Sequence, residues 1–368
     1  MQYRQFGKTG ETVSVLGFGA MRFPYKDGKV DADEAVAMMR HAIDQGLTYI
    51  DTAYFYHNGE SEAIVGRAVK DGYREKVHIA TKLPMSLVEK EEDFERFLST
   101  QLGRLELPYV DFYLLHALDR REWDKAKRLH IPEKMEQAKR DGRIRHIGFS
   151  FHDDYEIFQQ ILDEYDGWEF CQIQLNYVGT DYQAGLRGLE YAASKGLGVV
   201  IMEPLLGGKL AVPPRGVQAA LDPAKSPVEW ALDYLWNRPE VTLLLSGMST
   251  MQQAQDNLAY ADRARAGMLG QADLAMLAEA KRVYDTTALV PCTQCRYCMP
   301  CPFGVEIPNV FEAYNRTVSQ GNDAAKACYA EVQGKADLCR ACRKCEKVCP
   351  QHIPISEMMA EVRAAFAE

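Results

Sequence analysis

Short apolar runs alternate with amphipathic stretches along most of this 368-residue chain, and this alternation limits the folds that it can adopt. Most of the apolar runs are almost continuously apolar, as expected for a parallel sheet with helices over both faces. Eight strand and helix units in succession favour a closed (β/α)₈ barrel, or TIM barrel, over an open doubly wound sheet. The predicted strands are residues 15–19, 49–53, 77–83, 110–117, 144–150, 171–177, 198–204 and 241–247.

Two further segments have predicted places around this barrel. Residues 3–14, which read YRQF, GKTG and ETVS, are predicted to form a hairpin that plugs the bottom of the barrel. Residues 205–226 are rich in Gly and Pro and follow the seventh predicted strand, on the side where barrel active sites lie. We interpret them as a candidate lid, with a poorly ordered connection as the alternative.

Composition excludes several classes of partner. The 43 Lys and Arg residues against 52 Asp and Glu give a net charge of −9 without a long basic block, so neither nucleic acid nor an anionic membrane is expected as a partner. No apolar run approaches the roughly 20 residues of a spanning helix, and the first residues, MQYRQFGKTG, lack an apolar signal core. The chain is therefore expected in the cytoplasm, where thiols remain reduced.

Four polar residues follow or end predicted strands, where barrel enzymes place their catalytic groups. Asp51 and Tyr56 come from DTAYFYHNGESE, Lys82 ends IATKL and His116 ends YLLH. Reduction of a carbonyl to an alkoxide needs a proton donor, and a lysine ammonium beside a tyrosine makes the phenol a better one. Asp51 can hold the charge of a buried Lys82, and a neutral His116 can donate a hydrogen bond to the carbonyl oxygen. Each residue alone also has a structural interpretation, so the prediction depends on the set.

The motifs LGFGAMRF, DTAYFYHNGESE, ATK, LLH, GFSFH, QLNY and SGMSTMQQAQDNL occur in this order, and together they resemble the aldo-keto reductase superfamily over residues 1–285. The resemblance implies an NAD(P)H-dependent carbonyl reductase that binds its cofactor without a Rossmann phosphate loop. It also implies that Asp51, Tyr56, Lys82 and His116 are the catalytic tetrad. The positions that it implies for cofactor binding are Gly19, Ala20, Met21, Ser150, Gln174, Met202, Pro204, Leu205, Gly247, Gln253, Asp256 and Asn257.

Three positions depart from the family pattern. Phe151 stands where an asparagine commonly follows the serine, and Met202 stands where a tyrosine often stacks on the nicotinamide, although a thioether can also pack on a ring. Gly247 and Gln253 replace the Lys and Arg that hold the 2′-phosphate of NADPH in many members, which favours NADH and leaves NADPH open. If NADPH is preferred, Arg22 or Lys209 is the alternative cation for the 2′-phosphate. Gln253 also fits a helix-capping box with Thr250, so a structural role is equally well supported.

Eight of the ten cysteines lie in two runs near the end of the chain. Cys339, Cys342, Cys345 and Cys349, followed by Pro350, have the C-x₂-C-x₂-C-x₃-C-P spacing of bacterial ferredoxins. The other run has one residue fewer before its last cysteine and comprises Cys292, Cys295, Cys298 and Cys301, followed by Pro302. Each run is followed by an apolar segment with proline, which suggests a repeated half-domain. Zinc is the alternative, because paired CxxC motifs also bind zinc.

Ferredoxin logic predicts that the two [4Fe–4S] clusters share the runs. Cys292, Cys295 and Cys298 would bind one cluster with Cys349, and Cys339, Cys342 and Cys345 the other with Cys301. The interleaved cations are Arg296, Arg340, Arg343, Lys344 and Lys347, and they either offset the charge of the clusters or form a solvated surface. Cys171 and Cys328 have no such spacing and are predicted to be structural. The combination resembles a ferredoxin-bearing branch of the aldo-keto reductases.

Hydride transfer moves two electrons together, so a nicotinamide reductase does not need one-electron clusters. Three functions therefore stay open: a carbonyl reductase with structural clusters, a redox protein that passes nicotinamide electrons to a carrier, and a sensor of nicotinamide. The complete tetrad favours the first two. We expect a reductase of a small-molecule aldehyde or ketone, with a barrel at residues 1–285, a ferredoxin-like domain at 286–368, and an oligomeric state that the sequence leaves open.

Overall fold

In the computed structural model of the protein, eight parallel strands close into a barrel in the order in which they occur along the chain. The structure describes residues 1–287 and 290–367. All eight predicted strands are present, and the prediction of a (β/α)₈ barrel is confirmed. The barrel strands are β3 (Leu16–Gly19), β6 (Tyr49–Asp51), β7 (His78–Leu83), β8 (Val110–Leu118), β9 (Ile144–Phe151), β10 (Phe170–Gln174), β11 (Gly198–Met202) and β12 (Leu243–Ser246).

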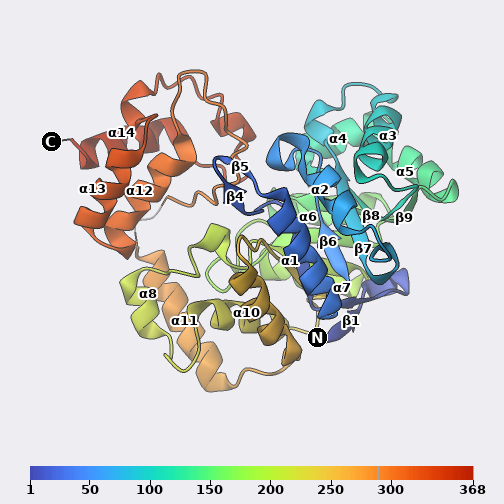
Figure 1. Ribbon diagram of the computed structural model, residues 1–368, viewed down its shortest axis with the longest axis horizontal. Helices are drawn as coiled ribbons and strands as arrows, with labels where there is room; N and C mark the ends of the chain where they lie inside the picture. Colours follow the sequence, from blue (N-terminus) through green and yellow to red (C-terminus); the bar gives the residue numbers. More distant parts are fainter. Residues whose placement is uncertain (288–289, 368) are drawn as a thin grey trace. The chain divides into compact units, whose positions relative to one another are not determined.

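Helices follow the barrel strands and cover their outer side, as Figure 1 shows for α1, α2 and α7. Their apolar faces are buried, for example Met38, Met39 and Ile43 of α1. These helices are α1 (Ala32–Asp44), α2 (Ser61–Ala68), α3 (Asp93–Leu105), α4 (Arg120–Arg128), α5 (Ile131–Arg140), α6 (Tyr155–Glu164), α7 (Gly185–Ser194), α9 (Pro227–Trp236) and α10 (Met251–Asp262). Short 3₁₀ turns are η1 (Gly7–Thr9), η2 (Tyr56–Gly59), η3 (Arg74–Lys76) and η4 (Met85–Leu87).

The predicted N-terminal hairpin is formed by β1 (Tyr3–Gln5) and β2 (Thr12–Ser14), which pair antiparallel. Phe6, at its tip, is fully buried against Phe112, Tyr49 and Phe170, at ring-centroid distances of 4.5 to 6.0 Å. Gly7 adopts a φ of +53°, and a Cβ there would lie 2.2 Å from the backbone nitrogen of Gly198. The prediction of a plug is therefore confirmed. A second hairpin, β4 (Tyr25–Lys26) and β5 (Lys29–Val30), lies between β3 and α1.

The chain divides into two compact units, residues 1–204 with 232–268, and residues 205–231 with 269–368. The second unit thus groups residues 205–231 and 269–285 with the cysteine-rich segment, and the division runs through α9. Its elements are η5 (Leu206–Gly208), α8 (Arg215–Ala220), α11 (Gln271–Asp285), α12 (Ile307–Ser319), α13 (Asn322–Glu331), η6 (Ala336–Leu338), η7 (Glu346–Val348) and α14 (Ile355–Ala365).

The candidate lid, residues 205–226, packs within this second unit. Its helix α8 lies against α11, and the Trp230 indole donates a hydrogen bond to the backbone oxygen of Asp222 at 2.9 Å. The Lys209 ammonium donates to the backbone oxygen of Val290 at 2.9 Å. The segment therefore has defined packing partners, whereas a lid function stays a prediction.

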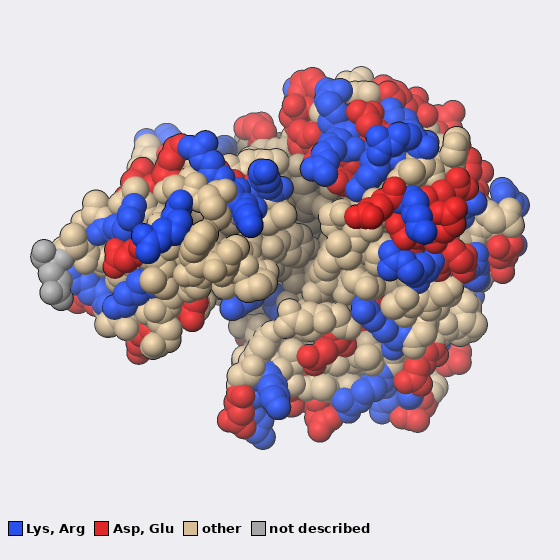
Figure 2. All heavy atoms as spheres, turned by 90° about the horizontal axis from the view of Figure 1, so that it is seen from above, with Lys and Arg blue, Asp and Glu red and all other residues tan. Residues whose placement is uncertain are grey.

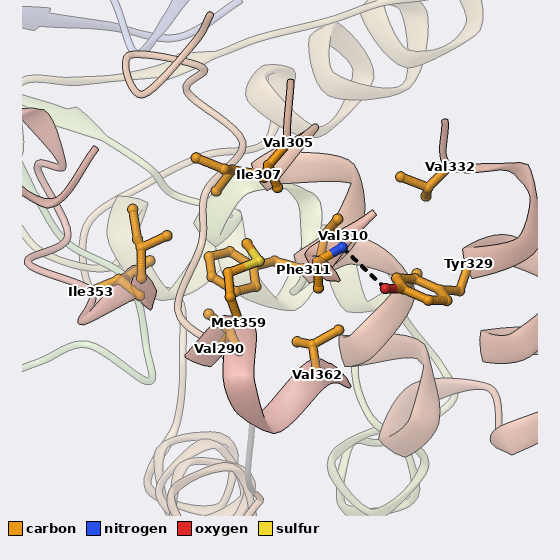
Figure 3. Close-up of a cluster of buried hydrophobic side chains, with 13 residues drawn as sticks. Val290, Val305, Ile307, Val310, Phe311, Tyr329, Val332, Ile353, Met359 and Val362 are labelled. Atoms are coloured by element: carbon orange, nitrogen blue, oxygen red, sulfur yellow. Dashed lines mark hydrogen bonds between the residues drawn. The ribbon is translucent and has the colours of Figure 1, made fainter. Parts of the chain in front are cut away.

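A small apolar core holds the cysteine-rich part of the second unit together (Figure 3). Val305 and Ile307 at the start of α12, and Ile353 and Ile355 at the start of α14, contribute in the same way from the two halves of the repeat. The Tyr329 hydroxyl accepts a hydrogen bond from the backbone N–H of Ala336 at 3.1 Å. Several cysteines of both runs pack against this core, so the core holds the two loops near each other.

Among the described residues, no helix has the length and apolar character that crossing a membrane would require.

Candidate functional site

The four predicted catalytic residues come together in the structure, all buried. Asp51 ends β6, Lys82 lies near the end of β7 and His116 near the end of β8. Tyr56 begins η2, where the next two residues, His57 and Asn58, both adopt left-handed backbone conformations. Strand order β6, β7, β8 thus brings three of the side chains to one edge, and the turn after β6 brings the fourth.

Lys82 is the centre of this group, with no exposed surface. Its ammonium donates hydrogen bonds to Asp51 Oδ1 at 2.6 Å and to the backbone oxygen of Thr52 at 2.8 Å. It also lies 3.4 Å from the Tyr56 hydroxyl. The ammonium therefore contacts an anion, a carbonyl dipole and the predicted proton donor at once.

Burial and neighbouring charges act on these groups in opposite directions. Burial lowers the pKa of Lys82, and the carboxylates of Asp51 and Glu62 partly offset that effect. Burial raises the pKa of Asp51, which the ammonium of Lys82 partly offsets. Asp51 Oδ2 is buried without a hydrogen-bond partner among the residues that the structure describes. Because each charge is costly to bury alone, Asp51 and Lys82 depend on each other.

His116 is positioned by an irregularity in β8. The pairing of β8 with β9 shifts register between Leu115 and Leu118, and Ala117 has a φ of +57°. The backbone N–H of Ala117 donates to Ser150 Oγ at 2.8 Å. A bulge of this kind redirects the adjacent side chain. Burial, with the charge of Lys82 next in size, pushes the pKa of His116 well below its usual value, so the imidazole is neutral and can donate one hydrogen bond.

A second buried carboxylate lies behind Lys82. Glu62, at the start of α2, has no exposed surface; its Oε1 accepts from Thr81 Oγ1 and from Gln101 Nε2, both at 2.7 Å. Gln101 Nε2 also lies 2.9 Å from the backbone oxygen of Lys82. Arg104 pairs with Glu62 Oε2 at 3.1 Å and donates to the backbone oxygen of Tyr54 at 3.2 Å. The network therefore ties β7 to α2, to α3 and to the segment that leads to Tyr56.

The predicted nicotinamide positions lie at the ends of neighbouring strands. Ser150 and Gln174 are buried at the ends of β9 and β10, and Met202 ends β11, where its sulfur accepts from Gln172 Nε2 at 3.7 Å. Ser150 Oγ accepts from a backbone N–H, so its own proton is available to an acceptor such as a carboxamide oxygen. The donor set fits a nicotinamide carboxamide.

Phe151 does not replace the missing asparagine. It packs into the layer between barrel and helices, with its ring centroid 5.1 Å from that of Phe158. Of the other predicted positions, Gly19, Ala20 and Met21 lie at the end of β3, where the N–H of Ala20 donates to the backbone oxygen of Asp51 at 2.8 Å. Pro204 follows β11, and Leu205 belongs to the second compact unit.

The adenosine-side positions lie on the segment from β12 into α10. Thr250 caps this helix by accepting from the backbone N–H of Gln253 at 3.2 Å, which is one half of the predicted capping box. Gln253 Oε1 accepts from the N–H of Ser249 at 2.8 Å and not from that of Thr250. Asp256 is exposed and accepts from Gln252 at 2.9 Å. Asn257 is buried and donates to Ser246 Oγ at 3.0 Å. Gln253 and Asn257 thus have internal partners already.

One of the two alternative cations, Arg22, has the aliphatic part of its side chain at Gly247. A Cβ on Gly247 would meet the side chain of Arg22 at 2.9 to 3.1 Å, so Arg22 packs directly over this glycine. The hydroxyl of Ser249 donates to the backbone oxygen of Arg22 at 2.8 Å, which fixes the arginine segment beside α10. Closure of the barrel between β3 and β12 brings these segments together.

The two cysteine loops adopt matching backbones. Gln294 and Ala341, each two residues after the first cysteine of its run, have φ values of +56° and +51°, and Arg296 and Arg343 have +65° and +58°. The N–H groups of Gln294 and Ala341 donate to Cys292 Sγ at 3.4 Å and to Cys339 Sγ at 3.5 Å. Turns that direct backbone N–H groups to one point form anion-binding concavities and are common at iron–sulfur sites.

The thiols of the two runs influence one another. Burial raises the pKa of the Cys298 thiol to about 12, with further contributions from Cys295, Cys292, Cys349 and Cys345. Burial raises the pKa of Cys345 to about 11, and Cys301 is among the groups that add to it. Because Cys298 is influenced by both Cys345 and Cys349, the two runs lie near each other, and the division of ligands between clusters stays a prediction.

No three His, Cys, Asp or Glu side chains among the described residues converge on a position that could hold one metal ion. In a [4Fe–4S] cluster, by contrast, each of four thiolates binds its own iron. The paired loops and their N–H donors fit such clusters.

Comparisons with known proteins place both parts of the chain. A model of the aldo/keto reductase family matches residues 15–214, and a model of a 4Fe-4S dicluster domain matches residues 291–354. The chain belongs to the aldo-keto reductase family. It carries a C-terminal 4Fe-4S dicluster domain, so the predicted combination is confirmed.

Curated relatives support this membership. L-galactose dehydrogenase from Arabidopsis thaliana is 30% identical over 281 residues, which are 70% of this chain and 88% of the relative. The uncharacterized oxidoreductase YrpG from Bacillus subtilis is 31% identical over 57% of this chain and 68% of its own length.

Solved structures share the fold of the barrel at lower identity. The holo form of aldo-keto reductase AKR11C1 from Bacillus halodurans aligns with a TM-score of 0.65 and 24% identity, covering 76% of this chain and 96% of that protein. An aldo-keto reductase from Klebsiella pneumoniae in complex with NADPH has a TM-score of 0.62 and 24% identity, covering 77% and 96%.

Sequence reasoning missed two features of this aldo-keto reductase. Glu62 lies in the motif NGESE, but nothing in the sequence indicates that it is fully buried and paired with Arg104. The Thr52 backbone oxygen on Lys82 has no sequence signal, because every residue carries a carbonyl. Arg22 is an alternative cation at the sequence level, and the barrel topology shows that its side chain packs against Gly247.

Proposed function

We propose that the protein reduces a small-molecule aldehyde or ketone to an alcohol with NADH or NADPH. The observation that carries the proposal is the buried Lys82 ammonium, held by Asp51 at 2.6 Å and lying 3.4 Å from the Tyr56 hydroxyl. Family membership and the NADPH complex of the Klebsiella pneumoniae relative support the choice of cofactor.

The nicotinamide, when bound, supplies the hydride. Ser150 and Gln174 would hold its carboxamide, and Met202 would pack near its ring. Tyr56 donates the proton to the carbonyl oxygen, and Lys82 stabilises the phenolate left behind. Asp51 keeps Lys82 charged in a site without solvent contact. Neutral His116 donates a hydrogen bond to the same carbonyl oxygen and orients the substrate.

Substitution Tyr56→Phe tests the role of the tyrosine. We expect kcat for a good aldehyde substrate to fall by about 10²-fold or more, the usual scale for a general acid, while cofactor affinity in fluorescence titration stays unchanged. Wild-type turnover by this variant would refute the assignment of the tetrad. A steady-state comparison of NADH and NADPH against aldehydes, ketones and quinones, with anaerobically purified protein, would identify the substrate class.

We also propose that the dicluster domain holds two [4Fe–4S] clusters, with Cys292, Cys295, Cys298 and Cys349 around one and Cys301, Cys339, Cys342 and Cys345 around the other. The clusters would supply one-electron redox capacity. The cysteine spacing and the 4Fe-4S dicluster match support two clusters, and the mutual influence of the two runs shows that they lie near each other. A cytoplasmic location, where free thiols persist, remains a prediction from cysteine usage.

A further inference from the structure

The second cysteine loop, residues 338–349, presents basic side chains to solvent. The exposed basic residues are Arg340, Arg343, Lys344 and Lys347. Cys342 is also exposed, whereas the other seven clustered cysteines are half-buried. Glu346 is the one acidic residue of the loop. Its carboxylate accepts hydrogen bonds from the backbone N–H and the hydroxyl of Ser356. The loop therefore carries a net positive charge on a chain whose total charge is −9.

Most of these cations lack the carboxylate partners that many surface cations of the barrel unit have. Among the residues that the structure describes, no carboxylate lies within 4.0 Å of Arg340, Lys344 or Lys347, and Arg343 has only two contacts of 3.9 Å. On the barrel unit, by contrast, Lys70, Lys134 and Lys139 pair with glutamates at 2.6 to 2.8 Å. Figure 2 shows basic and acidic side chains side by side over that unit. Clustered cations without partners repel one another, which is a cost to the free chain.

Exposed apolar side chains flank the same loop. Leu338 is 41% exposed, Val348 51% and Phe303 44%. A Cβ added to Gly304 would lie 3.8 Å from Leu338 Cδ1, so the turn that carries Phe303 is near the loop. An apolar patch with a charged surround is the composition of a protein interface rather than of an ordinary surface.

We propose that residues 338–348, together with Phe303, form the docking surface for a small acidic protein that carries one electron. The unpaired cations would attract its carboxylates, and the acidic remainder of this chain would repel them, so the field orients the carrier onto this loop. Docking at the exposed ligand Cys342 brings the carrier's redox centre to the edge of the dicluster domain. The reduced carrier would be oxidised and the oxidised cluster reduced by one electron, with no bond made and no proton moved. The inference rests on the dicluster domain and is independent of carbonyl reduction.

The test measures binding of a purified acidic [2Fe–2S] ferredoxin to the full-length, anaerobically purified protein by isothermal titration calorimetry. We expect binding at low ionic strength that weakens as salt is added. The double variant Lys344→Glu with Lys347→Glu should lose about 10-fold or more in affinity, since charge reversal turns attraction into repulsion. Val348→Ser should also weaken binding without changing the salt dependence.

A matched control reverses two exposed lysines of the barrel unit, Lys26→Glu with Lys29→Glu, and should keep wild-type affinity. Iron content and visible spectrum, measured on every variant, must equal the wild type, and Lys→Gln replacements serve for any variant that loses iron. The proposal would be overturned if the loop variant bound the ferredoxin with wild-type affinity, or if the control variant lost as much affinity as the loop variant. An affinity that does not change with salt concentration would also overturn it. So would a loop that mediates only self-association in analytical ultracentrifugation. Aldehyde reduction assayed on the same samples reports separately on the barrel site.

Discussion

Lys82 and Asp51 illustrate how much a single residue in this site depends on its neighbour. Lys82 has no exposed surface, and Asp51 is almost as buried. Removing one of them leaves the other as an unpaired buried charge, which typically costs about 3–5 kcal/mol of stability. Removing both leaves no such charge.

Comparing the single and double variants distinguishes the effect of Lys82 on catalysis from its effect on stability. We expect Lys82→Met to lower both kcat and the thermal midpoint, and the double variant Asp51→Asn with Lys82→Met to recover most of the lost stability but no activity. Differential scanning calorimetry and steady-state kinetics on the same samples check both parts. Recovery of activity in the double variant would mean that Lys82 serves only to neutralise Asp51.

We propose that Arg22 influences the choice between the two nicotinamide cofactors. The sequence pattern favours NADH because Gly247 and Gln253 carry no charge, whereas the structure places the Arg22 side chain over Gly247. A phosphate of charge near −2 gains from a guanidinium in contact with it.

We therefore expect Arg22→Met to weaken NADPH by about 10-fold and NADH by much less, measured by fluorescence titration. The shorter change Arg22→Lys keeps the charge and should retain most of the preference. Equal losses for the two cofactors would show that Arg22 contacts no 2′-phosphate.

At the scale of elements, α2 and α3 act on the site through β7. Glu62 from α2 contacts Thr81, and Gln101 from α3 contacts the Lys82 backbone. Arg104 from α3 pairs with Glu62, whose charge also raises the pKa of Lys82. The other charged or titratable groups around Lys82 are Asp51, Tyr56 and His116.

The direction in which Glu62→Gln shifts the pH profile of kcat follows from this charge. Loss of the carboxylate charge lowers the pKa of Lys82, so the ammonium is lost at lower pH and the alkaline limb of the kcat profile moves toward acid. Thr81→Val is the control, because it removes a hydrogen bond from the same network without removing charge, and its profile should keep the wild-type position. A Glu62→Gln profile that falls in height without moving would assign Glu62 a purely structural role.

The strands and the tetrad could be predicted because their signals are local: an apolar run ends, and a polar residue follows it. The contacts that tune the site could not, because they join residues from different elements. The left-handed Ala117 that redirects His116 has no sequence mark, since alanine rarely takes that conformation. The approach of Arg22 to Gly247 exists only once β3 pairs with β12.

At the scale of the whole molecule, the barrel and the cysteine-rich part of the second unit have separate apolar cores. The core of the cysteine-rich part is small. Clusters can supply folding free energy that this limited burial does not. We expect protein purified without oxygen to be brown, with about eight iron and eight sulfide per chain. Colourless protein with stoichiometric zinc would contradict the cluster assignment.

Loss of one cysteine ligand should affect the dicluster domain and leave the reaction of the barrel in place. We expect Cys342→Ala to lower iron content and to make the C-terminal segment sensitive to limited proteolysis, while reduction of a small aldehyde with NAD(P)H continues. Ser in place of the unclustered Cys328 is the control and should keep its iron. Loss of all reductase activity in Cys342→Ala, with the barrel still folded by calorimetry, would show that the clusters take part in the barrel reaction.

The proposed crossing of the two cysteine loops makes each cluster site depend on both runs. In that sharing, each cluster takes three thiolates from one run and the last cysteine of the other, so neither site has its four ligands unless both runs are present and folded together. A truncation before Cys339 is therefore expected to cost both clusters, although the first run keeps all of its own cysteines.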